Sequence, residues 1–135
     1  MLVLLDTNIC IHLINRRPGF EKILRRLSGR SFGEICISAI TVSELGYGVA
    51  KSKRSGDNAD TLDAFLSRFE LLDYPVAAAA SYGKVRTDLE RVGKSIGNND
   101  LLIAAHALTI GARVATSNAG EFERVRALKV LDWLA

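Results

Sequence analysis

The chain has little of what stabilises small secreted proteins or builds sulfur-ligated metal sites. Its 135 residues include only two cysteines, Cys10 and Cys36, which lie far apart in apolar segments. This number and spacing argue against a disulfide framework and against a cysteine-based zinc site. They favour two buried thiols in a reducing compartment, so we expect a cytoplasmic protein.

Long hydrophobic runs are also missing. The amino-terminal run from Leu2 to Leu5 stops at Asp6, has no basic leader and is too short for a signal peptide. No other stretch approaches the length of a membrane span, and no repeat, linker or low-complexity tract interrupts the chain. We therefore expect a soluble protein with no membrane contact.

The excess of positive charge is small. Lys and Arg number 18 against 15 Asp and Glu, for a formal net charge of +3. This excess is a weak indication of a polyanionic partner. Hydrophobic residues make up 48% of the sequence, which is enough at this length to bury one core. The sequence predicts a single domain over residues 1–135.

Short apolar runs, typical of strands buried on both faces, alternate with stretches of helical periodicity. Strands are predicted over 2–5, 35–37, 113–116 and 128–131. Helices are predicted to start after Asp6 and to cover 20–29, 38–49, 62–72, 77–92 and 98–110, with an exposed loop over 51–60 and a polar turn over 117–120. The alternation predicts an α/β fold in which a central parallel sheet is flanked by helices on both sides.

Three acidic residues stand where these elements meet. Asp6 follows the first predicted strand, Glu44 lies just beyond the second, and Asp100 opens a helix. Open α/β sheets bind ligands at the carboxyl edge, where all three would lie. Converging carboxylates repel one another unless a cation neutralises them, and oxygen ligands suit Mg²⁺ or Mn²⁺. The pattern indicates metal-assisted phosphodiester hydrolysis.

Each of these acids also has a purely structural explanation. Asp6 could cap its helix, Thr41 and Glu44 match a capping box, and Asp100 in a first turn complements the helix dipole. The coincidence of all three with one predicted edge of the sheet favours the site over the caps.

Four sequence blocks resemble, in order, those of PIN-domain proteins. They are LDTN at 5–8, ISAITVSELGYG at 37–48, IGNNDLLIAAHA at 96–107 and TSNAGEF at 116–122. Together they extend over nearly the full chain, and more narrowly they resemble the VapC toxins of type II VapBC toxin–antitoxin systems. The resemblance implies a single PIN-like domain and a Mg²⁺-dependent endoribonuclease that cleaves RNA by metal-activated water, with Mn²⁺ as a substitute ion.

Matched by position, the resemblance implies roles for individual residues. Asp6 and Asp100 would ligate the metal, and Glu44 would act as a third acid, directly or through a water molecule. The fourth acidic position of the family falls on Asn118, which leaves one anionic ligand fewer and puts a second metal ion in doubt. Glu121 is close enough in sequence to compensate, or it is a surface residue.

Supporting residues are proposed around the acids. The side chains of Thr7, Asn8 and Ser117 could orient carboxylates or water through hydrogen bonds. Arg86 stands in a helix that leads to the Asp100 block, where it could clamp a phosphate. The alternative is that Arg86 pairs with Glu90 one helical turn away.

The resemblance also implies partners: an RNA substrate, a cognate VapB-like antitoxin, and assembly as a homodimer and as a toxin–antitoxin hetero-oligomer. The alternative from another class is a non-catalytic module that binds the antitoxin on operator DNA, with the acids serving only as helix caps.

Overall fold

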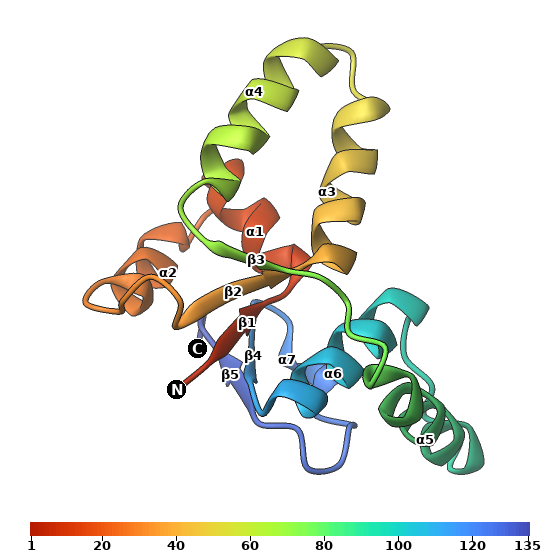
Figure 1. Cartoon of the computed structure of the whole chain (residues 1–135). Coiled ribbons are helices and arrows are strands. Elements are labelled where there is room, and N and C mark those ends of the chain that lie inside the picture. The colour runs from red at the N-terminus through yellow and green to blue at the C-terminus, as the bar shows by residue number, and fades with distance from the viewer.

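The fold is built on one sheet of five parallel strands (Figure 1). The computed structural model describes residues 1–135 throughout. The strands lie in the order β3-β2-β1-β4-β5, and every neighbouring pair is parallel. They are β1 Val3–Leu5, β2 Ile35–Ser38, β3 Glu70–Leu72, β4 Arg113–Thr116 and β5 Val130–Asp132. The predicted α/β class with a central parallel sheet is confirmed.

Strand β1 lies at the centre of the sheet and is buried on both faces. Val3 and Leu5 belong to one hydrophobic core, whereas Leu4 belongs to a second core on the opposite face. All three side chains are fully buried. This double burial explains why the run is apolar at every position instead of alternating.

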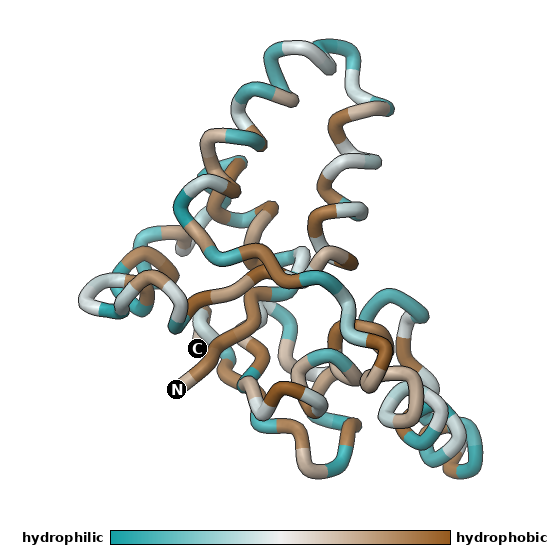
Figure 2. Tube along the Cα trace, in the orientation of Figure 1, coloured by the Kyte–Doolittle hydropathy of each residue, from teal (hydrophilic) through white to brown (hydrophobic).

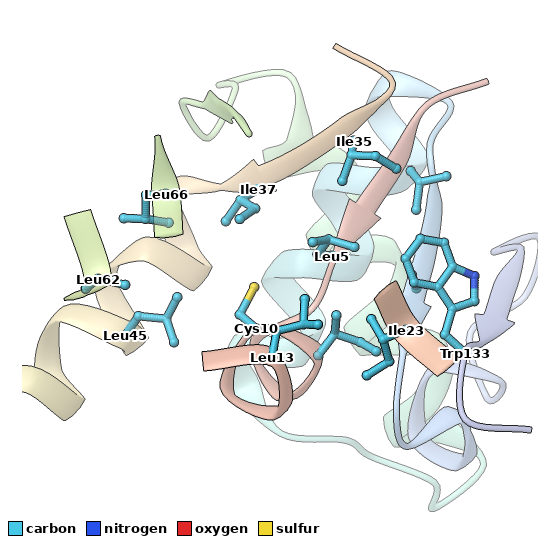
Figure 3. Close-up of a cluster of buried hydrophobic side chains, with 13 residues drawn as sticks. Leu5, Cys10, Leu13, Ile23, Ile35, Ile37, Leu45, Leu62, Leu66 and Trp133 are labelled. Carbon is cyan, nitrogen blue, oxygen red and sulfur yellow. The ribbon is translucent and has the colours of Figure 1, made fainter. Parts of the chain in front are cut away.

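Four helices cover the face toward which Val3 and Leu5 point. They are α1 (Thr7–Ile14), α2 (Phe20–Leu27), α3 (Ala39–Ala50) and α4 (Ser55–Leu66). Ile23, the one buried residue of α2, packs in the same core as Trp133 near the carboxyl terminus (Figure 3). Helices α3 and α4 lie side by side and extend away from the sheet as a hairpin (Figure 1).

Three helices cover the opposite face of the sheet. They are α5 (Ala78–Arg91), α6 (Asn98–Ile110) and α7 (Ala119–Phe122). Helix α6 is buried on most sides, as its nearly uniform apolar sequence predicts, and it packs along α5. It ends at Gly111, whose φ of 70° lies in the left-handed region that glycine adopts without steric penalty. None of the helices has the length and hydropathy that a membrane span requires.

The loop predicted over 51–60 is wrong beyond Arg54, because α4 begins at Ser55. The first turns of α4 are polar because they face solvent, and Figure 2 shows the hydrophilic tip where α3 connects to α4. The buried anchors of this helix, Leu62 and Leu66, come only in its second half. A short stretch without large apolar residues therefore resembles a loop until the packing partner is known.

The helix predicted over 62–72 is wrong beyond Leu66. Glu70–Leu72 instead forms β3, an edge strand that pairs with Cys36 to Ser38 of β2. Three residues are too few to show a periodicity of their own. The hydrogen bonds to β2, which the local sequence does not reveal, decide the conformation.

Two smaller differences lie near the carboxyl terminus. The polar turn predicted over 117–120 contains the start of α7, which runs over Ala119–Phe122. The last strand occupies Val130–Asp132 rather than 128–131. In both places the element is short, and tertiary contacts set its bounds.

Candidate active site

The predicted acids stand at the carboxyl edge of the sheet, around the central strand. Asp6 directly follows β1, Glu44 lies in α3 just after β2, and Asp100 lies in the first turn of α6. Strand β1 has β2 on one side and β4 on the other, so the chain connections diverge at this point. Such a switch point opens a crevice at the carboxyl ends of the strands.

Asp6 is held by two hydrogen bonds from different parts of the chain. Its Oδ1 accepts a bond of 2.8 Å from the backbone N–H of Ile9, and its Oδ2 accepts one of 2.6 Å from the hydroxyl of Thr116. Asp6 is therefore the N-cap of α1, as the structural alternative predicted, and it is also 1% exposed. Burial raises its pKa to about 6, although both hydrogen bonds lower the pKa; the charge of Glu44 adds to the rise.

Glu44 does not form the predicted capping box. The N-cap of α3 is Ser38, whose Oγ accepts from the N–H of Ile40, and Thr41 lies buried inside the helix. The Oε1 of Glu44 instead accepts a hydrogen bond of 2.6 Å from the hydroxyl of Thr7. The capping explanation for Glu44 is therefore wrong, and Thr7 orients this carboxylate as proposed from the sequence.

Asp100 forms a carboxyl pair with Glu121. The pKa of Asp100 is raised to about 7, mainly by burial, and also by its hydrogen bond with Glu121 and by the negative charges of Glu121, Asp6 and Glu44. The charges of Asp6 and Glu44 thus act on Asp100 as well, with smaller effects than burial and Glu121. Glu121 is thus part of the acidic cluster, which Asp6, Glu44, Asp100 and Glu121 form at the sheet edge.

The other predicted site residues near this edge are Asn118, Asn8 and Ser117. Asn118 is exposed, and its backbone N–H donates a bond of 2.9 Å to the Thr116 hydroxyl that in turn contacts Asp6. Its side chain caps no helix. Asn8 is exposed and Ser117 is half-buried, and neither side chain forms a hydrogen bond within the chain. Sequence reasoning missed Thr116, although its place at the end of β4 puts it on the same edge.

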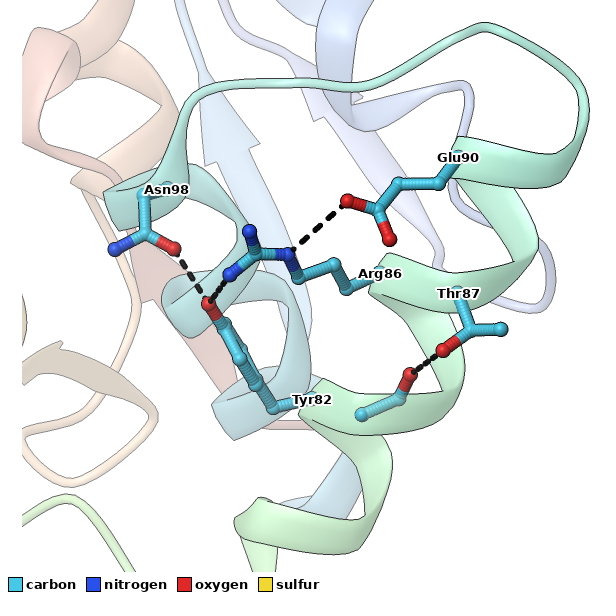
Figure 4. A network of polar contacts seen from close by, with 6 residues as sticks. Tyr82, Arg86, Thr87, Glu90 and Asn98 are labelled. Atoms are coloured by element: carbon cyan, nitrogen blue, oxygen red, sulfur yellow. Dashed lines mark hydrogen bonds and ion pairs between the residues drawn. The ribbon is translucent and has the colours of Figure 1, made fainter.

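Arg86 makes a local network on α5 instead of contacting the cluster (Figure 4). Its Nε lies 3.4 Å from Oε2 of Glu90, which is the predicted pair one helical turn away. Its Nη1 donates a bond of 3.0 Å to the hydroxyl of Tyr82, and this hydroxyl donates to Asn98 at the start of α6. The network borders a cavity of about 280 Å³. Arg86 therefore reaches the helix that carries Asp100 only through Tyr82 and Asn98.

The two histidines, His12 and His106, make their hydrogen bonds elsewhere in the fold. His106 is buried, its Nδ1 lies 2.8 Å from Oγ of Ser38, and burial lowers its pKa. His12 contacts the carbonyl oxygen of Pro18 through Nε2. Neither imidazole is a hydrogen-bond partner of the acidic cluster.

The acidic cluster has no positively charged partner within the chain. The four ion pairs of the structure all join other residues. As they stand, no three of the acids are grouped closely enough to hold a metal ion, and Asp100 pairs with Glu121. An all-oxygen donor set with uncompensated charge nevertheless fits a hard cation such as Mg²⁺, which would replace the proton shared by that pair.

The protein is therefore a parallel α/β domain that carries carboxylates without cationic partners at the switch point of its sheet. The PIN domain family model matches residues 3–128, and the chain belongs to this family.

Its relatives place it among the VapC proteins. It is 44% identical over 134 residues to Ribonuclease VapC2 of Rickettsia felis, an alignment that covers 98% of each chain. It is 41% identical over 130 residues to the tRNA(fMet)-specific endonuclease VapC of Shigella flexneri, covering 96% of each. Among solved structures, it superposes on DNA-bound VapBC from Salmonella typhimurium with a TM-score of 0.90 at 41% identity, covering 98% of this chain and 99% of the other.

Proposed function

We propose that this protein is a Mg²⁺-dependent endoribonuclease, the toxin of a toxin–antitoxin pair. One observation carries the proposal: four carboxylates meet at the sheet edge without any cationic side chain among them. Helix caps alone do not require such a cluster, and its mutual repulsion destabilises the metal-free fold. The names of the relatives as ribonucleases support RNA as the substrate class.

Asp6 and Asp100 would hold the metal ion, and the carboxylates of Glu44 and Glu121 would add negative charge beside it. When bound, Mg²⁺ would activate a water molecule and offset the charge that builds on the phosphate. Thr116 and Thr7 keep the carboxylates of Asp6 and Glu44 oriented through their hydroxyl groups. These hydrogen bonds preorganise the oxygen ligands, which reduces the rearrangement needed on binding.

A VapB-like antitoxin is the proposed protein partner, because the similar solved structures are VapBC complexes. A groove of about 310 Å³ between α1, α3 and α4 offers a place for it. The groove has apolar walls, including Ile11, Ile14 and Leu45, and it reaches Glu44. A peptide seated there would contact Glu44. We further propose a homodimer of the toxin within a toxin–antitoxin hetero-oligomer.

The decisive experiment uses purified protein free of antitoxin. Initiator tRNA is the first substrate to test, because one relative is named for it. We expect cleavage in Mg²⁺ or Mn²⁺ and none in EDTA, with the Asp6→Asn variant as the matched inactive control. Equal cleavage in EDTA would contradict the metal requirement. Absence of cleavage by folded protein that still binds its antitoxin would favour the non-catalytic module instead.

A further inference from the structure

The positive charge of the chain is concentrated in one short segment. Residues 16–30 contain six basic residues and one acidic residue, a net charge of +5, whereas the whole chain carries +3. The rest of the molecule is therefore net negative. The segment comprises the turn after α1, the whole of α2 and the residues that follow it. We call its six basic side chains the α2 basic surface: Arg16, Arg17, Lys22, Arg25, Arg26 and Arg30.

These cations are exposed and without acidic partners. Five of the six are exposed and Arg30 is half-buried. None belongs to any of the four ion pairs. Arg30 packs over the ring of Trp133, 5.5 Å from its centroid, and Lys22 reaches the carbonyl oxygen of Leu134 at 3.5 Å. The remaining four guanidinium groups contact no acceptor of the chain, so they are available to a partner.

Helix stability does not account for this arrangement. Lys22, Arg25 and Arg26 stand at spacings of three and four along α2, where like charges destabilise an isolated helix. The last-turn residues Arg25 and Arg26 do complement the helix dipole. That effect does not extend to Arg16 and Arg17, which precede the helix in a turn where Arg16 has a φ of 47°. A polyanion bound at this surface would offset the repulsion.

The α2 basic surface is rigidly placed, but it is separate from the acidic cluster. Ile23 anchors α2 in the core beside Trp133. Helix α1 begins next to Asp6 and leads away from the edge over eight residues, a length of about 12 Å, before the basic turn starts. In Figure 1, α2 lies on the far side of the sheet from α5 and α6. A ligand that contacts both the acidic cluster and the α2 basic surface must therefore reach along the length of α1.

We infer that the α2 basic surface binds the sugar-phosphate backbone of a structured RNA at a point away from the scissile bond. This inference rests on the proposed ribonuclease function. Arginine supplies five of the six cations, and its planar fork suits the two oxygens of a phosphate. The contacts hold a large RNA in place while a separate part of it occupies the acidic edge.

The binding test uses a labelled initiator tRNA transcript and protein made inactive by Asp6→Asn. In that background, Arg17, Arg25 and Arg26 are changed together to Gln, and a control protein carries Lys53→Gln, Arg68→Gln and Lys129→Gln. Both triple variants lose the same charge at exposed positions without ion pairs. Fluorescence anisotropy over a range of salt concentrations then gives the affinity and its salt dependence.

We expect the α2 triple variant to bind tRNA about tenfold more weakly at low salt, with a slope of log affinity against log salt that is less steep by about 2 to 3. The control variant should keep wild-type affinity to within about twofold. Equal affinity and equal slope for the two triple variants would overturn the assignment. If the triple variant is less stable in thermal melts, the double variant Arg16→Gln and Arg17→Gln replaces it, because both positions lie outside the helix. The double variant should also bind tRNA more weakly and with a less steep salt dependence than the control.

A kinetic test separates this inference from the function on which it rests. In otherwise wild-type protein, the α2 triple variant should show a raised KM for tRNA and an unchanged kcat. Cleavage of a short oligonucleotide that fills only the acidic edge should be unchanged. If the wild-type protein does not cleave RNA, the proposed function is contradicted. If it cleaves RNA and the α2 triple variant keeps the wild-type KM, only the role of α2 is contradicted.

Discussion

The hydroxyl of Thr116 donates a hydrogen bond of 2.6 Å to Oδ2 of Asp6, joining residues 110 positions apart in the sequence. The same hydroxyl accepts a bond from the N–H of Asn118. The contact connects the ends of β4 and β1 in a buried position. It lowers the pKa of Asp6 against the larger opposing effect of burial. Thr116 therefore helps to keep Asp6 ionised near neutral pH.

Replacing Thr116 with Val removes this donor while preserving the shape of the side chain. We expect a stability loss of about 1 to 3 kcal/mol, because a buried oxygen of Asp6 loses its partner. The pKa of Asp6 should rise above its value of about 6, so cleavage should fall more at acidic than at alkaline pH. The measurements are urea unfolding and pH profiles of kcat/KM. Thr116→Ser should restore the wild-type profile, and identical profiles for Val and Ser would contradict the role.

Replacing Asp6 with Asn tests the metal site against the cap. Asn caps a helix about as well as Asp, so a residue that is only a cap should tolerate the change. Because Asp6 also belongs to a repelling cluster, we expect the Tm of the metal-free protein to rise and cleavage to collapse. The increase in Tm on adding Mg²⁺ should shrink or vanish, since that increase reflects binding to the folded state. Retained cleavage with an undiminished Mg²⁺ effect would refute the assignment.

The raised pKa of Asp6 predicts a pH dependence of stability. The carboxyl group of Asp6 has a pKa of about 6 in the folded chain, whereas its ordinary pKa is 3.8. The folded state therefore binds the proton more tightly, and the stabilisation is complete below the ordinary value and lost as pH rises through about 6. Relative to Asp6→Asn, we expect metal-free wild type to lose up to about 3 kcal/mol of unfolding free energy over this window. Urea unfolding in EDTA measures the difference, and a constant difference would show that Asp6 is not buried as described.

Asn118 stands where the resemblance to the PIN-domain family implies a fourth acid. We expect Asn118→Asp to tighten Mn²⁺ binding by adding a negative oxygen ligand near the cluster. Isothermal titration calorimetry measures the affinity, and Glu121→Gln is the matched variant expected to weaken it, because it removes the acid that pairs with Asp100. An unchanged affinity in Asn118→Asp would place this side chain outside the metal shell, consistent with its exposure.

The sequence by itself determined the features that depend on local composition. The apolar run of β1 is buried on both faces, and a strand of that kind belongs in a parallel sheet with helices on both sides. Parallel strands end at one edge, so the positions of Asp6, Glu44 and Asp100 just beyond strands or at a helix start were enough to bring them to that edge. The helices α5 and α6 followed from length, strong helix formers and a terminal glycine.

Only the tertiary structure decided the short elements and the partners of each acid. The three residues of β3 are strand because β2 supplies their hydrogen bonds, and the polar first turns of α4 are helix because Leu62 later anchors them. Glu44 is bound by Thr7 rather than by a cap, and Asp100 pairs with Glu121. Each of these outcomes is a contact between segments distant in the chain, and the free energy of such a contact depends on burial and geometry that no local sequence pattern encodes.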